Sequence, residues 1–302
     1  MKWNLNASCL GIRARENEVI ELALTYGFTT FDLDANSFIG NLQTRGPETA
    51  TRFISSGNIK IGSFSIPVDL SADDAEFNDQ WQTLQSCLDT IASFGTSVAI
   101  ATVSPHHPSL PYQENFERHR QRLDTMASEL AKHGMRLAID LGEDCQPSEE
   151  GGHSFIRSPE ALIALMRTVS HDQIGICVDT WSWFQNEGTV QQIQALSSDK
   201  ILYVRLSGVA DPVEDSSGEL VPASSRCLLS QNDQTVPTAE FRALLEEIGF
   251  DGLIAPACHS LQVTGMSKDQ VTKAAAKSLE VFISPPANDE TAEVEETVSA
   301  SS

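Results

Sequence analysis

The feature of this sequence that most constrains its fold is a regular alternation of short apolar segments with amphipathic segments that stop at a glycine. The apolar segments are rich in β-branched residues and bounded by turn residues, so they predict buried strands. The amphipathic segments repeat their apolar positions with the helical period, so they predict helices that cover those strands. Strand and helix alternate eight times, at a spacing of about 25 to 40 residues that allows helical crossovers between parallel strands. This pattern predicts an α/β fold, a single (β/α)8 TIM barrel.

The expected elements follow directly from this pattern. Strands are expected at residues 3–8, 29–35, 59–67, 97–103, 136–141, 174–178, 200–207 and 252–258. Helices are expected at residues 16–26, 48–56, 73–94, 114–133, 158–169, 189–197, 238–248 and 267–283. The main alternative, an open doubly wound sheet, would require a glycine-rich phosphate-binding turn after the first strand. Cys9-Leu10-Gly11-Ile12 stands there without a GxGxxG pattern, so the barrel is favoured.

The barrel is assigned to residues 1–284 and a disordered acidic tail to residues 285–302, where five acids stand without a base or an apolar face. The 302 residues include 20 basic and 42 acidic ones, and the net charge of -22 argues against binding to nucleic acid or an anionic membrane. No run is apolar enough for a membrane span or a secretory signal. The six cysteines form no CxxC pair and fit reduced thiols. We therefore expect a cytoplasmic protein, and a homo-oligomer is compatible with this composition.

Polar side chains that could carry chemistry stand where the expected strands end. In a TIM barrel the functional residues come from the carboxyl ends of the strands, so these side chains are expected to meet at the barrel mouth. Carboxylates and imidazoles dominate the set, and such groups build hard-metal and acid–base sites. The candidates, in chain order, are Asp32, Asp34, His106, His107, Asp140, Glu143, Asp144, Asp179, Trp181, Ser182, Trp183, Arg205, Ser207, His259 and Ser260.

Over about residues 1–282, the sequence resembles the sugar phosphate isomerase/epimerase family of xylose isomerase-like TIM barrels. The family's sixth strand, which ends in an aspartate followed three residues later by a histidine, is similar to IGICVDTWSWFQNEGT. Its seventh strand is similar to KILYVRLSGV, and its last helix and strand are similar to EFRALLEEIGFDGLIAP. The segment that leads from helix four into strand five is similar to SLPYQENFERHRQRLDTMASELAKHGMRLAID. The resemblance implies an isomerase or epimerase of carbohydrate metabolism.

The resemblance also implies a divalent metal held by a Glu on strand five, an Asp on strand six, a His on strand seven and a Glu on strand eight. Asp179 matches this pattern, but Asp140 replaces the first Glu, Arg205 replaces the His, and Ala257 replaces the second Glu. A guanidinium cannot ligate a metal and, at about 4 Å, repels a divalent ion. We therefore expect no metal cofactor; a rearranged site for Mn, Zn, Co or Mg would use Asp140, Asp179 and His259.

Arg205 is instead expected to take the place of the metal and to form ion pairs with Asp140 and Asp179. Such a cluster has two interpretations: a structural ion-pair network, or an anchor for a carboxylate or phosphate ligand. The family's substrate-binding His is replaced by Ser182, whereas Arg226 matches an arginine of its strand-seven loop.

The candidate site residues fall into two groups. Asp140 and Asp179 are the candidate catalytic residues. The candidate substrate-binding residues also have structural interpretations, the tryptophans as core residues and the paired histidines as members of a proline-containing surface loop. They are Trp181, Ser182, Trp183, Arg205, Arg226, His106, His107 and His259.

Three functions are consistent with these residues. The first is a pseudoenzyme of the family that lacks metal-dependent catalysis and binds a small sugar-like or anionic ligand at the barrel mouth. The second is an active isomerase, epimerase or lyase with a rearranged acid–base or metal site. The third is a non-catalytic scaffold or regulatory barrel whose surface and acidic tail contact a partner protein.

Overall fold

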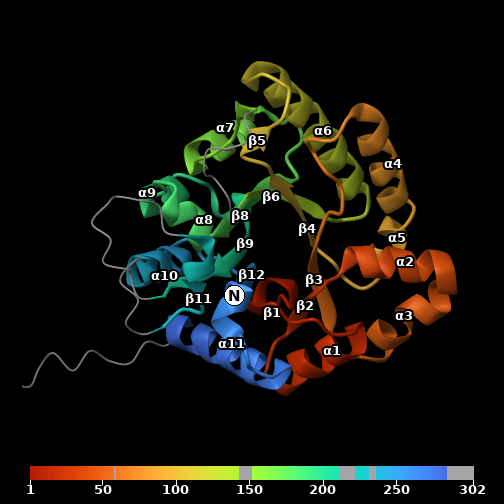
Figure 1. Cartoon of the computed structure of the whole chain (residues 1–302), viewed down its shortest axis with the longest axis vertical. Coiled ribbons are helices and arrows are strands. Elements are labelled where there is room, and N and C mark those ends of the chain that lie inside the picture. The colour runs from red at the N-terminus through yellow and green to blue at the C-terminus, as the bar shows by residue number, and fades with distance from the viewer. Residues whose placement is uncertain (58, 143–151, 211–221, 231–235, 284–302) are drawn as a thin grey trace, which may run out of the picture.

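The computed structural model of the chain describes residues 1–57, 59–142, 152–210, 222–230 and 236–283. Eight strands form a closed barrel in the order β1-β12-β9-β8-β6-β4-β3-β2, and each pair of neighbours with a described register is parallel (Figure 1). Around this ring, each strand lies beside the barrel strands that precede and follow it in sequence, which is the (β/α)8 topology that the sequence predicts. The barrel strands are β1 (Lys2–Leu5), β2 (Thr30–Leu33), β3 (Lys60–Ser65), β4 (Val98–Val103), β6 (Arg136–Leu141), β8 (Ile174–Asp179), β9 (Ile201–Leu206) and β12 (Leu253–Pro256).

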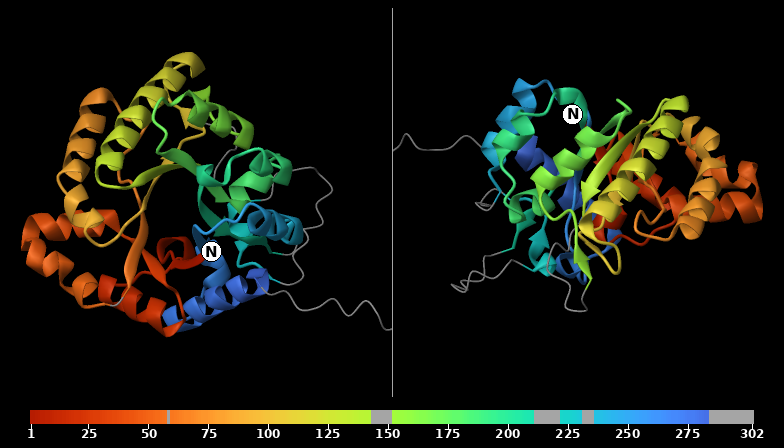
Figure 2. Two further views of the ribbon diagram at one scale, coloured as in Figure 1. Left: turned by 180° about the vertical axis from the view of Figure 1, so that it is seen from behind. Right: turned by 90° about the horizontal axis from the view of Figure 1, so that it is seen from above.

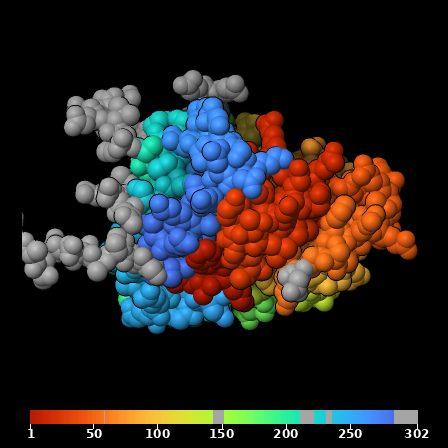
Figure 3. Space-filling model, turned by 90° about the horizontal axis from the view of Figure 1, so that it is seen from below, coloured from red at the N-terminus to blue at the C-terminus, as the bar shows by residue number. Residues whose placement is uncertain are grey.

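Helices surround the barrel and cover the outer faces of its strands (Figure 1, Figure 2). The last helix lies beside the first on the outside of the molecule, so the eighth unit packs against the first and completes the ring (Figure 3). No helix in the described part of the chain combines the length and apolar character needed to span a membrane. The helices are α1 (Glu16–Thr25), α2 (Ala35–Arg45), α3 (Pro47–Ser56), α4 (Asp74–Gln85), α5 (Leu88–Ala92), α6 (Tyr112–Lys132), α7 (Pro159–Thr168), α8 (Thr180–Gln185), α9 (Val190–Gln194), α10 (Thr238–Glu247) and α11 (Lys268–Ile283).

Apolar side chains fill two separate regions. The larger one lies between the strands and the helices, because alternate strand residues face outward and meet the apolar faces of the helices. The smaller one contains the inward-facing apolar side chains of the strands. Toward the carboxyl ends of the strands, where the candidate site lies, the inward-facing residues are polar. The residues of the smaller region are Val98, Ile100, Ala138, Cys177, Leu202, Tyr203, Leu253 and Ala255.

The pairing of β8 with β9 is irregular. Ile176 lies opposite Ile201, whereas the next residue of β8 lies opposite Tyr203, so β9 carries one extra residue between these two pairs. This is the geometry of a β-bulge. Beyond the bulge Asp179 lies opposite Arg205, and both side chains face the same side of the sheet.

Several elements differ from those predicted by the sequence pattern. No helix is predicted for residues 35–45, but α2 forms there, because Ala35, Phe38, Ile39 and Leu42 repeat at the helical spacing and the side chain of Asp34 caps the helix by accepting a hydrogen bond from the Ser37 amide. Gly46, at φ 77°, separates α2 from α3, which begins with Pro47. The single helix predicted for residues 73–94 is two helices, α4 and α5. The sequence pattern predicts no helix between residues 178 and 189, but the chain forms a short helix there, α8.

Two small antiparallel sheets stand outside the barrel and escape the sequence pattern because each strand has only two residues. One pairs β5 (His106–His107) with β7 (His153–Ser154), and the other pairs β10 (Gly208–Val209) with β11 (Arg226–Cys227). The described residues also include four 3-10 helices: Ser8–Leu10, Ser198–Lys200, Ala223–Ser225 and Ser260–Val263. The predicted tail, and the candidates Glu143 and Asp144, lie outside the described residues.

Candidate functional site

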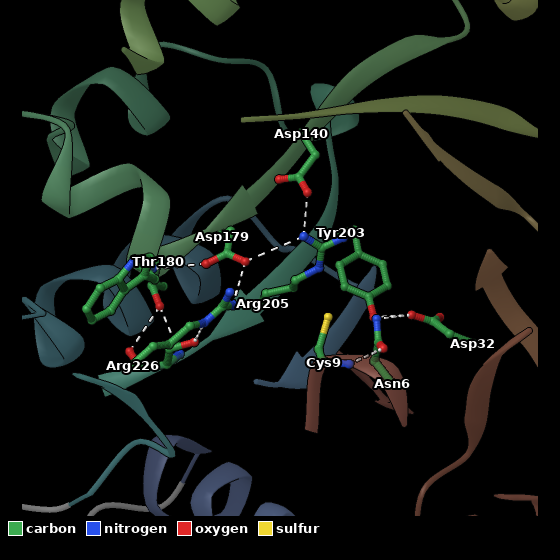
Figure 4. A network of polar contacts seen from close by, with 11 residues as sticks. Asn6, Cys9, Asp32, Asp140, Asp179, Thr180, Tyr203, Arg205 and Arg226 are labelled. Carbon is green, nitrogen blue, oxygen red and sulfur yellow. Dashed lines mark hydrogen bonds and ion pairs between the residues drawn. The ribbon is translucent and has the colours of Figure 1, made fainter. Parts of the chain in front are cut away.

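An arginine lies between two carboxylates where β6, β8 and β9 end (Figure 4). Asp140 is the penultimate residue of β6, Asp179 is the last residue of β8, and Arg205 is the penultimate residue of β9. Nη1 of Arg205 donates a hydrogen bond to Oδ2 of Asp140 and lies 3.5 Å from Oδ2 of Asp179. All three residues are buried, with exposed fractions of 4%, 2% and 6% in chain order. The fold therefore brings together three side chains that lie far apart in sequence.

A second buried arginine completes this group, which we call the ion cluster (Asp140, Asp179, Arg205 and Arg226). Arg226 lies on β11, which pairs with β10 just after β9. Its Nη2 donates to Oδ2 of Asp179 over 2.6 Å, and its Nε donates to Oγ of Ser207 over 2.8 Å. The other oxygen of Asp179 accepts the backbone N–H at the start of α8. Asp179 is therefore bound by two guanidinium groups and by the helix that it caps.

Charges balance inside the ion cluster, because two guanidinium groups face two carboxylates. Burial raises the pKa of Asp140 to about 6, although the adjacent Arg205 opposes this effect. Burial disfavours the charge of Arg205, but Asp140 and the other acidic groups around it raise its pKa well above the usual value. Oδ1 of Asp140 and Nε of Arg205 are buried without hydrogen-bond partners within the described chain. The pair therefore stays ionised at neutral pH, while one acceptor and one donor remain available.

A different arrangement holds the carboxylate on the opposite side of the barrel, which we call the Asp32 network (Asn4, Asn6, Asp32, Ser63 and Tyr203). Asp32 on β2 accepts hydrogen bonds from Nδ2 of Asn4 and of Asn6, each over 2.6 Å. It also accepts from the Tyr203 hydroxyl over 2.8 Å and from the Ser63 hydroxyl. Burial raises the pKa of Asp32, and these hydrogen bonds partly offset that effect. Four neutral donors thus fill the acceptor positions of this carboxylate.

The two groups meet on β9, which supplies Tyr203 to one and Arg205 to the other (Figure 4). The guanidinium carbon of Arg205 lies 5.7 Å from the centre of the Tyr203 ring, within range of a cation–π contact. Cys9 lies nearby, and its backbone N–H donates to Oδ1 of Asn6 over 2.9 Å. Burial raises the pKa of the Cys9 thiol to about 11, so it is neutral at physiological pH.

A cavity of about 940 Å³ opens beside Asp32 at the carboxyl ends of β1, β2 and β3, and we call it the mouth cavity. The β1–α1 loop, the segment that follows β2, and helices α1 to α3 form its walls. No residue of the ion cluster lines it in the described structure. Its charged lining residues are Arg13, Arg15, Glu16, Asp32, Asp34 and Arg45.

The tryptophans and the serine that follow Asp179 are buried in α8. Trp183 is 1% exposed, belongs to the core between the barrel and the helices, and donates its Nε1–H to the Thr189 carbonyl over 3.2 Å. Trp181 is 3% exposed. Ser182 is 1% exposed, and its hydroxyl has no hydrogen-bond partner in the described structure. Trp183 therefore has the packing of a core residue, while a substrate contact by any of the three stays a prediction.

The histidine candidates lie in different places. His106 and His107 form β5, which stands between α6 and α7, outside the ring of barrel strands (Figure 1). Nδ1 of His107 accepts backbone N–H groups of its own loop, and its Nε2 lies 3.2 Å from the Ser71 carbonyl. His259 caps a 3-10 helix, and its backbone N–H donates to the Arg226 carbonyl. In the described structure, the side chains of these three histidines do not converge on one site.

Several polar residues of the barrel mouth are not among the candidates predicted from the sequence. Asn4 and Asn6 alternate with apolar residues in the first strand, and this alternation is the signal that both face the interior. Tyr203 stands two residues before Arg205, so the two must share a face of β9. No comparable signal marks Ser63 or Glu16.

The residues present do not fit the divalent metal that the resemblance implies. A guanidinium bridges the two carboxylates that remain of the implied ligand set. Among the described residues, no group of three or more His, Cys, Asp or Glu side chains converges in a way that could hold a metal ion. No step of the chemistry can therefore be assigned to a metal at this position.

The fold and the polar barrel mouth define a TIM barrel with its candidate site at the carboxyl ends of the strands. Within this class, residues 20–283 match the family model described as xylose isomerase-like TIM barrel, and the chain belongs to that family. No curated protein matches the sequence.

Solved structures share this fold at low sequence identity. A xylose isomerase domain protein from Alicyclobacillus acidocaldarius superposes with a TM-score of 0.77 at 17% identity, over 94% of this chain and 98% of that one. The IOLI protein, solved with a bound zinc atom, gives 0.74 at 14% identity, over 94% and 98% of the two chains. A D-psicose 3-epimerase in the presence of D-fructose gives 0.68 at 12% identity, over 94% and 99%. These neighbours are an epimerase and other xylose isomerase-like proteins, and one of them binds zinc.

Proposed function

We propose that this chain is a metal-independent member of its family, which binds a small sugar-like or anionic molecule at the barrel mouth. The observation that carries this proposal is the bridge from Arg205 to Asp140 and Asp179. A divalent ion about 4 Å from a guanidinium is repelled by about 8 kcal/mol at an effective dielectric of about 20. The ion cluster thus supplies its own positive charge at the place where the family resemblance implies a metal.

Metal analysis of the purified native protein tests this proposal. We expect far less than one equivalent of Mn, Zn, Co or Mg per chain, since the residues described at the barrel mouth include no group that could hold a metal ion. One equivalent of any of these metals, retained through dialysis against a chelator, would contradict the proposal.

A double variant tests whether the guanidinium of Arg205 and the missing ligand at Ala257 are what exclude a metal. Ala257 is fully buried, and its backbone N–H donates to the Leu206 carbonyl, so it lies beside the end of β9. Arg205→His with Ala257→Glu replaces the repelling cation and restores two ligands near Asp179. We expect Mn²⁺ to raise the melting temperature of this variant and to leave both single variants unchanged, because ligand binding to the folded state stabilises it. An equal response of the wild type would contradict the proposal.

A second candidate function is metal-independent acid–base catalysis by Asp140. The unpartnered Oδ1 of Asp140, together with its raised pKa, supports it. Turnover of a sugar in the presence of a chelator that is lost in Asp140→Asn would establish this activity. Turnover that survives the substitution would exclude Asp140 as the acid or base.

A further inference from the structure

The charged side chains that line the mouth cavity differ from those of the ion cluster in how many of them already have partners within the protein. Among its acidic lining residues, Asp32 already accepts four hydrogen bonds, and Asp34 accepts hydrogen bonds from the amide and the hydroxyl of Ser37. Both carboxylates are therefore occupied by the protein itself. Glu16 is the acidic residue of the lining that differs.

Glu16 is the first residue of α1 and is half-buried in the cavity wall. Its Oε1 is shielded from solvent and has no hydrogen-bond partner in the described structure. Burial and, to a smaller extent, the nearby Asp34 raise the pKa of Glu16 to about 7. A carboxyl group without a partner in the wall of a cavity can form a hydrogen bond with a ligand that enters.

Positive charge lines the same cavity. Arg13, Arg15 and Arg45 are exposed, and the ion pairs formed within the described residues do not include them. Phe53, which is 46% exposed, adds an apolar surface to the wall. While Glu16 is protonated, the three arginines outnumber Asp32 and Asp34, and this local positive excess in a protein with a net charge of -22 favours an anion over a neutral molecule.

We propose that the mouth cavity binds a small hydroxylated organic anion, whose anionic group contacts the arginines and whose hydroxyl groups contact Glu16. The ligand site then lies between α1, α2 and α3, on the opposite side of the barrel from the ion cluster (Figure 1). This inference rests on the proposed function, because it names the place and the chemical class of the molecule that the barrel mouth binds.

The site also makes the affinity depend on pH. The charged groups around Glu16 are Arg13, Arg15, Asp32, Asp34 and Arg45, and none of the lining residues is a histidine within the described chain. Protonated Glu16 donates a hydrogen bond and leaves the arginines in excess of the two aspartates. Ionised Glu16 cancels that excess, so the anion binds more weakly as the pH rises through about 7.

Isothermal titration of the full-length chain with D-gluconate tests this proposal, because gluconate carries a carboxylate and five hydroxyl groups and keeps its charge between pH 6 and 8. Sorbitol lacks the carboxylate and acetate lacks the hydroxyl chain, so both should bind much more weakly than gluconate. We expect Arg13→Gln and Arg45→Gln each to weaken gluconate binding about 10-fold. The wild-type affinity should fall about 5-fold from pH 6 to pH 8, and Glu16→Gln should remove this dependence.

Two matched variants control for general charge effects. Glu21→Gln changes an exposed acid of α1 that does not line the cavity, and Arg167→Gln changes an exposed arginine of α7. Both should bind gluconate as the wild type does. If gluconate binds but the cavity variants have no effect, the inference is overturned and the proposed function stands. If gluconate does not bind, the inference is overturned as well, and metal analysis together with binding of neutral sugars then tests the proposed function separately.

Discussion

The two sides of the barrel mouth hold their buried carboxylates by different means. On the side of β6, β8 and β9, Asp140 and Asp179 are bound by the guanidinium groups of Arg205 and Arg226. On the side of β1, β2 and β3, Asp32 is bound by amide and hydroxyl donors that carry no charge. The first side is packed with its own counter-ions, whereas the second opens into a cavity lined by Arg13, Arg15 and Arg45, which form no ion pair within the described residues.

The two sides therefore differ in what they can bind. The ion cluster stands where the family resemblance implies a metal, whereas the mouth cavity has room for a small molecule. A ligand that separated the buried ion pair of Arg205 and Asp140 would leave an uncompensated charge, and this cost disfavours binding between the two side chains. Within the described residues, Oε1 of Glu16 has no hydrogen-bond partner and the exposed arginines of the cavity form no ion pair. The two carboxylates that match positions of the implied metal site are held by arginines, and under our proposals recognition is expected in the mouth cavity.

The largest predicted effect comes from breaking the ion cluster. Arg205→Met removes the cation between Asp140 and Asp179 and leaves Asp140 without a counter-ion, so we expect the free energy of unfolding to fall by about 3 to 5 kcal/mol. Urea denaturation monitored by tryptophan fluorescence measures this change.

The paired variant sharpens this prediction. Arg205→Met with Asp140→Leu replaces both partners by apolar groups, and Asp179 keeps Arg226. The double variant should regain more than about 1 kcal/mol over Arg205→Met alone. A double variant that is no more stable than the single one would show that the lost charge balance is not the cause.

A smaller loss of unfolding free energy is expected from a substitution in the Asp32 network, on the opposite side of the barrel from the ion cluster. Asp32→Asn keeps the shape of the side chain but turns one acceptor oxygen into a donor, which faces two of the four donors of the Asp32 network. We expect a loss of about 2 kcal/mol in unfolding free energy, because the removed charge offsets part of the lost hydrogen bonding.

Asp34→Asn is the matched control, since Asp34 caps α2 and asparagine caps helices equally well. Its unfolding free energy should stay within a few tenths of a kcal/mol of the wild-type value. A loss at Asp32 as large as that of Arg205→Met would remove the distinction between neutral and charged partners.

The smallest effect depends on pH. The pKa of Glu16 is raised in the folded state from 4.5 to about 7, so between these values the folded chain binds more protons than the unfolded chain. The contribution of Glu16 to the free energy of unfolding therefore falls as the pH rises from 4.5 to 7. Glu16→Gln should be more stable than the wild type by about 1 kcal/mol at pH 8 and equally stable at pH 4, a modest gain because water reaches the side chain.

Thermal unfolding of wild type, Glu16→Gln and Glu21→Gln across pH 4 to 8 measures this contribution. Glu21→Gln should follow the wild-type curve at every pH. A constant difference between Glu16→Gln and the wild type would mean that Glu16 does not titrate in this range.

The sequence predicts the barrel because its information is local: each strand and each helix has its own period, and eight repeats exclude most other topologies. The pairing of Arg205 with Asp140 and Asp179 could be predicted because all three stand at strand ends and the family resemblance assigns them to positions of one implied metal site. The helix α2 was predictable on the same grounds as the other helices, because Ala35, Phe38, Ile39 and Leu42 repeat at the helical spacing after the capping residue Asp34.

The other side of the mouth depends on arrangements that a single sequence does not encode locally. The mouth cavity exists because α2 and α3 stand apart from the ends of β1 and β2, and no motif in the chain specifies that spacing. Ser63 meets Asp32 only through the register of β3 against β2, which shifts between Phe31 and Asp32. The alternation of the first strand indicates that Asn4 and Asn6 face the barrel interior. It does not indicate which carboxylate their side-chain amides contact.

The bulge in β9 determines where the length of this strand is constrained. Ile201 belongs to the apolar region next to the helices and Tyr203 to the one inside the barrel, so the extra residue, Leu202, is the one that interrupts the alternation of faces. Deleting Leu202 would leave Tyr203 opposite Cys177 and Arg205 opposite Asp179, so both polar groups of the mouth would keep their members. Deleting Val204 would instead turn Arg205 out of the barrel, so the loss of a single codon spares the ion cluster at the bulge and destroys it two residues further on.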